Sequence, residues 1–517
     1  MPEYLHPGVY VEEIERGPKP IEGVPTSTAA FIGETERGPT KPRLVTSYKD
    51  YQRWFGGVFG ESKFMPYAVN GFFENGGKRM YVCRVTDDAA TPAEVVFGNF
   101  TVRTVGPGSW GKRVYAKIEP SSTKKPGAGP NAAPVPVGFR LRLAYYSKTP
   151  VKKPLEWFTD PMKEPFPTLS ETFDDLEMDE QSPNYWEKRL RDNSALAELV
   201  RKSGAPPNEI PPPAFGPLAA NGADGNLVLD VADFQGLDQP PRQKPQGLAA
   251  LELDPYREVA LVYAPGAPVD MNRAVIAHCE RLKYRFAVVD PEKSVNVSDL
   301  QPRSAIQDTK YAALYYPWIT VPDPQTGARK DVPAGGHVLG VYARTDSERG
   351  VFKAPANEIL RGVIELLADI DDNKQDVLNP RGVNAIRQFP ERGIRVWGAR
   401  TLTSDALWKY VSVRRLFIFL ERSIYEGTQW VVFEPNDDRL WARVIDTIRL
   451  FLRTQWRLGA LFGRTEEEAF FITCDRTTMT QDDILNGRLI CEIGIAPVRP
   501  AEFVIFRIFQ HTAEAQT

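Results

Sequence analysis

The chain ends in a long apolar run, and this run constrains the fold more than any other feature. Residues 503–509 read FVIFRIF, in which a single arginine interrupts six apolar side chains. Aromatic and β-branched residues of this kind favour a strand. Such a strand is an aggregation hazard unless its backbone and side chains are covered. We expect residues 501–517 to form a C-terminal strand arm that pairs at a distance.

The first residues also predict an extended arm. Residues 1–20 contain GVYVEEIE, and their prolines disfavour a helix. Added to the sheet edge of a second copy, either arm would satisfy its backbone and build an open helical filament. The alternative is that both ends pair within their own subunit. The predicted arm strands comprise Val9, Tyr10, Val11, Ile14, Phe503, Val504, Ile505, Phe506, Ile508 and Phe509.

Between the arms, the composition and the hydrophobic pattern of the sequence change several times, which predicts a multidomain α+β and α/β fold. Residues 95–254 contain strand-like pieces separated by Pro/Gly-rich stretches, typical of a β-rich insertion with long loops. In residues 255–375, strand and helix patterns alternate, which indicates an α/β domain with a parallel sheet. Residues 21–94 and 376–500 are expected to form an α+β domain together.

The clearest local signals are those of helices. TSYKDYQRWFG has a Thr or Ser cap, and FMPYAVNGFFENGG is stopped by a glycine pair. Residues 404–427 and 437–463 have the pattern of two long amphipathic helices.

Arginines gather on one side of the second of these helices. At about 100° per residue they project within a sector of about 120°, away from most of the apolar residues. We interpret them as a basic stripe that faces an acidic partner, with a solvated helix face as the alternative. The stripe comprises Arg439, Arg443, Arg449, Arg453, Arg457 and Arg464.

Two glycine patterns resemble nucleotide sites but lack the required context. Gly106, Gly108 and Gly111 have the dinucleotide spacing, yet the residues that follow alternate as a strand instead of a helix. We expect a tight turn between two strands here. Residues 71–78 approximate a P-loop, but one residue too many precedes Lys78 and Arg79 replaces the hydroxyl.

We expect no catalytic, cofactor-binding or metal-binding residues. There are four histidines, and no H-E-x-x-H or G-x-S-x-G pattern occurs. The acidic pairs at 174–175, 371–372 and 437–438 fit helix caps, loops or solvated faces better than acid–base catalysis. An enzyme built from dispersed residues stays open, most plausibly a nucleotide-dependent one on residues 255–375.

Composition bears on whether the protein binds nucleic acid, enters a membrane, is secreted or is held by disulfides. The 67 acidic and 64 basic residues nearly cancel, which gives no signal for nucleic acid. No apolar run approaches the ~20 residues of a membrane span, and the first residues lack a secretory pattern. We therefore expect a protein made in a cytoplasm, without direct membrane insertion. Four scattered cysteines argue against a disulfide framework or a zinc site, so we expect reduced, mostly buried thiols.

Taken together, short pieces in order along the chain resemble the tail sheath proteins of contractile phage tails and phage-like extracellular injection systems. The pieces lie at residues 7–14, 23–33, 72–85, 107–114, 171–178, 379–387, 393–402, 410–424 and 433–437, and in the terminal strand. Each is weak alone, and their joint order over most of the chain carries the resemblance. The Pro/Gly-rich insertion matches least well.

The resemblance implies a non-enzymatic structural subunit that polymerises helically around an inner tube, exchanges arm strands with its neighbours and contracts to drive the tube forward. It implies that the α+β domain and the basic stripe face the tube and that the insertion lies outside. The implied partners are further copies of this chain, an inner tube protein, and baseplate and terminal cap proteins. The particle would be assembled in a bacterial cytoplasm. A baseplate or cap component of the same machine is the alternative, and two interlocking arms favour the sheath.

Overall fold

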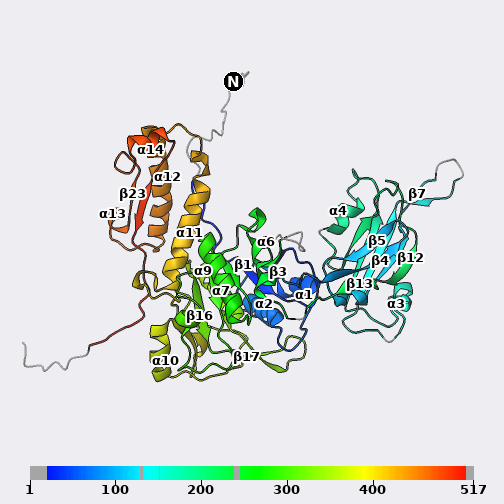
Figure 1. The fold of residues 1–517 in the computed structure, drawn as a ribbon, viewed down its shortest axis with the longest axis horizontal. Helices are drawn as coiled ribbons and strands as arrows, with labels where there is room; N and C mark the ends of the chain where they lie inside the picture. Colours follow the sequence, from blue (N-terminus) through cyan, green and yellow to red (C-terminus); the bar gives the residue numbers. More distant parts are fainter. Residues whose placement is uncertain are drawn as a thin grey trace, which may run out of the picture. The chain divides into compact units, whose positions relative to one another are not determined.

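The structure is a computed structural model that describes residues 20–127, 132–150, 152–191, 193–226, 228–237 and 245–507. The chain divides into two compact units. The larger is Pro25–Arg414, and the smaller comprises the described parts of Met1–Val24 and Arg415–Thr517. Figure 1 shows the order of the elements along the chain.

In the described chain, the larger unit is built around a nine-stranded sheet. Neighbouring strands from β3 through β1, β14, β15 and β16 to β21 are parallel, and short antiparallel strands flank them. The strands in spatial order are β19 (Glu358–Ile359), β22 (Gly393–Val396), β21 (Val383–Phe389), β16 (Ala312–Tyr316), β15 (Phe286–Val289), β14 (Leu261–Tyr263), β1 (Ala29–Gly33), β3 (Met80–Arg84) and β2 (Arg43–Val45).

The central strands are apolar on both faces, as parallel strands covered by helices must be. Every residue of β1, β3, β14, β15 and β16 is buried. The helices of this part are α1 (Tyr48–Phe55), α2 (Met65–Glu74), α5 (Val231–Gln235), α6 (Gly247–Leu251), α7 (Val269–Leu282), α8 (Pro302–Ala305), α9 (Gly335–Arg349) and α10 (Asp372–Leu378). A small sheet of β18 (Arg329–Val332), β17 (Ile319–Pro322) and β20 (Glu365–Leu366) completes it.

The helices α2 and α9 approach closely because glycines line their contact. A Cβ added to Gly340 would lie 2.5 Å from the carbonyl oxygen of Phe72, and one added to Gly71 would lie 2.2 Å from Nδ1 of His337. His337 is fully enclosed at this contact, and burial lowers its pKa to about 4. The sequence pattern did not reveal this packing.

The nine-stranded sheet differs from the predicted domain division. β1 and β3 come from residues 21–94 and pair with each other, yet β1 also pairs directly with β14 of residues 255–375. The strands after residue 376, β21 and β22, belong to the same nine-stranded sheet. Residues 21–94 and 376–500 therefore do not form a domain separate from residues 255–375, as had been expected. The reason is that a parallel strand finds its partner across a long connection, which leaves no local signal.

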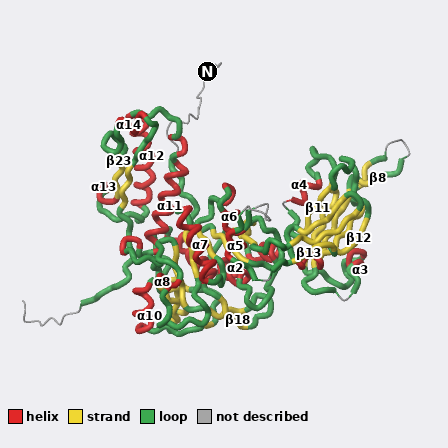
Figure 2. The backbone as a smooth tube through the Cα atoms, viewed as in Figure 1, coloured by secondary structure: helices red, strands yellow, loops and turns green. Residues whose placement is uncertain are grey.

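The β-rich insertion is a sandwich of two four-stranded sheets, shown in yellow in Figure 2. One sheet is β10 (Leu169–Leu176), β9 (Phe139–Tyr145), β6 (Val114–Pro120) and β12 (Ala214–Pro217); the other is β11 (Ala197–Arg201), β5 (Phe100–Thr104), β4 (Thr91–Phe97) and β13 (Ala220–Ala223). A two-stranded ribbon, β7 (Lys124–Lys125) and β8 (Val135–Pro136), and the helices α3 (Leu155–Thr159) and α4 (Trp186–Arg191) belong to the same region.

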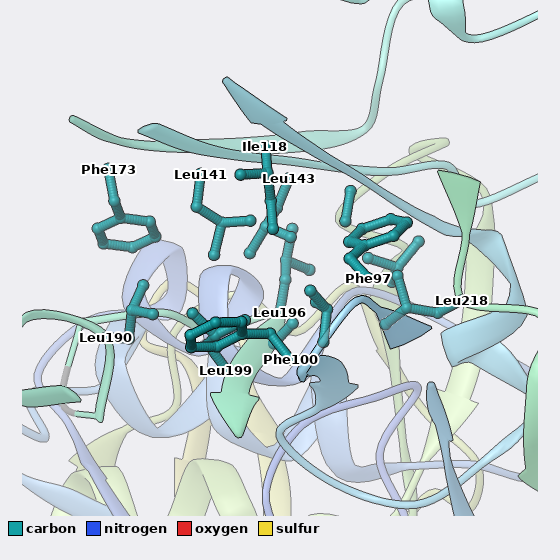
Figure 3. Close-up of a cluster of buried hydrophobic side chains, with 14 of the residues drawn as sticks. Phe97, Phe100, Ile118, Leu141, Leu143, Phe173, Leu190, Leu196, Leu199 and Leu218 are labelled. Carbon is teal, nitrogen blue, oxygen red and sulfur yellow. The ribbon is translucent and has the colours of Figure 1, made fainter. Parts of the chain in front are cut away.

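Alternating burial explains the sandwich. Along β6 and β5 every second side chain is buried, as in a sheet with one face on a core. Figure 3 shows Leu141 and Phe173 from one sheet facing Phe100 of the other. The strands run from residue 91 to 223, whereas the prediction placed the insertion at 95–254; α5 and α6 follow the sandwich.

The glycine-rich stretch connects two strands, as predicted, but through a short 3₁₀ helix instead of a tight turn. A short 3₁₀ helix, Ser109–Arg113, links β5 to β6, and its Trp110 is buried with the indole N–H donating to the Pro107 carbonyl at 2.9 Å. Gly106 is required because a Cβ there would lie 2.0 Å from the Gly38 carbonyl oxygen. Close packing of the chain on itself therefore accounts for this glycine.

The smaller unit contains two long helices and a short sheet. Its elements are α11 (Val411–Gly427), which begins in the last residues of the larger unit, α12 (Asp438–Arg457), α13 (Glu466–Ala469), β23 (Phe470–Thr473), α14 (Gln481–Leu485) and β24 (Glu492–Ile495). Asp437 caps α12, as Asp371 caps α10, which confirms the helix-start interpretation of these acids. The pair at 174–175 instead lies at an irregularity in β10, where Asp175 has a φ of 55°.

Candidate assembly surfaces

The C-terminal segment of the smaller unit is apolar and uncovered. Residues 501–507 follow β24 without forming a strand or helix within the described chain. Phe503, Val504, Ile505 and Phe506 are 71%, 67%, 78% and 84% exposed. Leaving four such side chains in water forfeits roughly 1.5–3 kcal/mol each relative to full burial. The segment is therefore suited to an intermolecular contact. Ile508 and Phe509 lie outside the described residues.

The sheet in the same unit is small. Among the described residues, β23 and β24 form an antiparallel pair with Phe470 opposite Ile495. Phe470 is buried and β23 contacts α12, while Phe471 on the other face is 58% exposed. An isolated pair of strands is marginal in water, and three or more strands are the usual minimum. Further strands would therefore stabilise this sheet.

The start of the described chain is fastened to α11. The backbone N–H of Val24 donates to Oγ of Ser423 at 3.1 Å, and Ile21 is buried beside Gly427. The arm that precedes it contains the predicted strand residues Val9, Tyr10, Val11 and Ile14, which lie outside the described residues. These residues stay a prediction.

The helix α12 carries the predicted basic stripe on its outer side. Its buried residues are Leu440, Trp441, Val444, Thr447, Ile448, Phe451 and Leu452. Arg439, Arg443 and Arg457 are exposed, and Arg449 and Arg453 are partly exposed. Arg464 lies beyond the last residue of the helix, because α12 ends at Arg457 before Gly459.

Acidic side chains that the sequence pattern did not reveal compensate part of the stripe. Arg453 donates to Glu466 at 2.6 and 3.2 Å, and Arg449 lies 3.6 Å from the same carboxylate. The hydrogen bond from Arg453 lowers the pKa of Glu466 below its usual range.

Arg443 pairs in the same way with Glu434 at 3.0 Å. Arg439, Arg457 and Arg464 form no ion pair with any described residue. They are the stripe's most available charges.

A hollow of about 290 Å³ in the larger unit bears on the nucleotide hypothesis. It lies at the carboxyl ends of the parallel strands β1 and β14, the edge at which open α/β sheets often bind ligands. Among its described lining residues the one cation is Lys63, which pairs with the carboxylate of Glu34. The hollow thus offers no uncompensated positive charge to a phosphate.

The described residues contain neither a metal-binding cluster nor a membrane-spanning helix. No group of three or more His, Cys, Asp or Glu side chains there is arranged to hold a metal ion. In the same residues, no helix has both the length and the apolar character needed to cross a membrane.

Family models decide the relationship. The phage tail sheath protein central domain matches residues 242–402, and the phage tail sheath C-terminal domain matches residues 403–511. Together they span more than half of the chain. The chain belongs to the phage tail sheath family. This membership confirms the resemblance inferred from the sequence, and the boundary between the two models lies near the division into two units.

Individual sheath proteins and structures agree with the family. A putative prophage major tail sheath protein of Pseudomonas aeruginosa is 27% identical over 198 residues, covering 37% of this chain and 49% of that protein. The chain therefore matches about half the length of this curated relative.

Two solved sheaths share the fold across the whole chain. The helical sheath of the anti-feeding prophage in its contracted state has a TM-score of 0.59 at 24% identity, covering 98% of this chain and 100% of that one. The sheath complex of an extracellular contractile injection system, also contracted, has a TM-score of 0.58 at 24% identity, with 99% of each chain covered.

Proposed function

We propose that this chain is the structural subunit of a contractile sheath, which polymerises helically around an inner tube and contracts to drive that tube through a target envelope. Family membership and the fold shared with two contracted sheaths support the proposal. The single observation that carries it is the exposed apolar segment at residues 503–506.

The arms would join the subunits. The C-terminal segment of one copy adds as a strand to the β23–β24 sheet of another, and the N-terminal arm does the same. Each added strand satisfies backbone groups and buries apolar side chains that the single chain leaves in water. Because this contact is head-to-tail, it extends into an open helix of subunits.

Contraction would be a two-state change of the polymer. Each subunit rotates as a rigid body while the exchanged arms act as hinges. The energy is stored in the extended lattice, and the step consumes no nucleotide. The basic stripe on α12 faces an acidic tube wall, through contacts of about 0.2–1 kcal/mol each that break as the sheath slides.

The remaining partners follow from the same role. A sheath begins at a baseplate and ends at a cap, so we propose both as partners, with assembly in a bacterial cytoplasm as part of a phage tail or a phage-like extracellular particle.

Proline variants of the C-terminal segment test the strand exchange. Proline removes a backbone N–H and is harmless in an unpaired extended segment, but it breaks a central strand. Val504→Pro and Ile505→Pro remove N–H groups that point to opposite edges. We expect that a segment inserted between two strands fails to polymerise with either substitution, and that a segment at an edge fails with one of them.

The assay is negative-stain electron microscopy of the chain expressed with its tube protein. Val504→Ile and Ile505→Val are matched controls that keep strand character and should give normal tubes. Circular dichroism and size-exclusion chromatography check that each variant monomer is folded. Normal tubular polymers from both proline variants would contradict the proposed exchange of the C-terminal arm.

A further inference from the structure

Two of the four cysteines lie opposite each other at the end of the small sheet. The register of β23 and β24 runs from Phe470 opposite Ile495 to Thr473 opposite Glu492. One residue further, the same register places Cys474 opposite Cys491. Each thiol is near enough to shift the pKa of the other. Because 16 residues separate them in the chain, the sequence alone gave no sign of this pairing.

The backbone pattern identifies which type of cross-strand pair this is. The N–H of Ala496 donates to the carbonyl of Ala469 at 2.9 Å, so these two residues form a hydrogen-bonded pair. Pair types alternate along an antiparallel ladder, which makes Cys474 and Cys491 a non-hydrogen-bonded pair. In such pairs the Cα atoms are about 4.5 Å apart, within the roughly 4.4–6.8 Å that a disulfide spans.

We propose that Cys474 and Cys491 are a redox pair, which closes into a cross-strand disulfide when the protein meets a small-molecule disulfide such as oxidised glutathione. Cys491 is partly exposed and Cys474 is buried, so the thiolate of Cys491 attacks first. It forms a mixed disulfide and releases one glutathione thiolate. The thiolate of Cys474 then attacks the Cys491 sulfur and releases the second glutathione. Two thiol protons pass to water, and the two electrons leave in the two reduced glutathione molecules.

The disulfide would close a loop that already contacts the beginning of α12. Residues 475–490 include α14 and lie between the two cysteines. In this loop the carbonyl of Arg488 accepts from Nδ2 of Asn436 at 3.0 Å, and Arg476 lies 3.8 Å from Asp438. A covalent bond at the base of the loop limits its opening and holds the two strands together. The sheet would then be stabilised without any added strand.

The surroundings of the thiols make closure slow near neutral pH. Burial raises the pKa of Cys491 to about 12 and also raises the pKa of Cys474. Because the thiolate is the attacking species, few molecules are reactive at pH 7, and the rate should rise roughly tenfold per pH unit below the pKa. The pair is therefore expected to close slowly in an oxidising medium near neutral pH.

Peptide mapping of the full-length chain tests the proposal. The purified protein is incubated with oxidised glutathione at alkaline pH, unfolded, blocked with N-ethylmaleimide and digested with trypsin. Arg476 and Arg488 both lie between the cysteines, so digestion leaves Cys474 and Cys491 on separate peptides. We expect these peptides to appear joined and to separate on reduction. Finding both peptides alkylated, or each carrying glutathione, would overturn the proposal.

Two serine variants and a melting curve complete the test. Cys279→Ser, at a fully buried cysteine on α7, should leave the cross-link unchanged, while Cys491→Ser should abolish it. The oxidised wild-type chain should melt about 5–10 °C higher than the same chain reduced, as expected for a loop of this length. Equal melting temperatures for the two redox forms would contradict a structural role for the bond.

Discussion

The sheets of the two units manage their edges differently. The nine-stranded sheet of the larger unit ends in β19, with two residues, and β2, with three, and its central strands are completely buried. Short edge strands protect a sheet against further pairing. The smaller unit pairs two four-residue strands within the described chain and leaves an apolar segment exposed nearby in sequence. The nine-stranded sheet is thus protected against further pairing, while the small sheet of the other unit gains stability from partner strands.

The largest effect is expected from a substitution at a tight helix contact inside the larger unit. Gly340→Val places side-chain atoms against the Phe72 carbonyl, only 2.5 Å from the new Cβ. Helix α9 must then move away from α2, and we expect a loss of about 3 kcal/mol or more in the free energy of unfolding. Urea denaturation followed by circular dichroism measures it.

Gly459→Ala in the smaller unit is the matched comparison. Gly459 has a φ of 87° but nothing within 4 Å of its added Cβ, so backbone strain alone should cost about 1–2 kcal/mol. Equal losses in the two variants would show that the close contact between α2 and α9 at Gly340 is not what makes the valine substitution destabilising.

A smaller loss of stability is expected when the pH is lowered. The folded-state pKa of His337 is about 4, below its ordinary value, because the ring is buried. Its contribution to stability is therefore present above pH 6.5 and is lost as the pH falls toward 4. We expect about 2 kcal/mol of this contribution to disappear between pH 7 and pH 5.

The measurement is the difference in pH dependence between the wild type and His337→Asn. Asp290 acts with the opposite sign, since burial raises its pKa to about 6 and its contribution is lost as the pH rises. Subtracting the pH profile of unfolding free energy of His337→Asn from that of the wild type removes the contribution of Asp290, which is common to both. Parallel profiles would mean that His337 does not titrate as a buried neutral ring.

The smallest effect is expected from reversing single charges of the basic stripe in the smaller unit. Arg439→Glu and Arg457→Glu reverse charges that form no ion pair with any described residue. Each should weaken association with an acidic tube by about 0.2–1 kcal/mol and reduce its salt dependence, and Arg439→Glu should do so without changing the melting temperature of the monomer.

Arg453→Glu is the control. It breaks the pair with Glu466, so we expect it to lower the stability of the monomer as well. Co-sedimentation with assembled tubes over a salt series measures the association. Unchanged binding in both the Arg439 and Arg457 variants would contradict a tube-facing stripe.

Local structure could be predicted from local sequence. Ser47 caps α1 and Asp437 caps α12, and both helices lie where their patterns indicated, because caps and helical periodicity act within a few residues. The alternation along β6 likewise indicated a strand soon after Gly111, although a short 3₁₀ helix, Ser109–Arg113, precedes it. The sequence predicted a strand without a local partner at residues 503–506; the structure has an exposed apolar segment without regular secondary structure there, so the strand stays a prediction.

Only the tertiary structure decided what these elements meet. It paired β1 with β14, compensated Arg453 with Glu466 and placed Cys474 beside Cys491. Each of these contacts depends on strand register or on helix packing between residues that are not sequence neighbours. The chain must close a loop before such a contact can form, so its partner is chosen by the whole fold and leaves no signature in the adjacent residues.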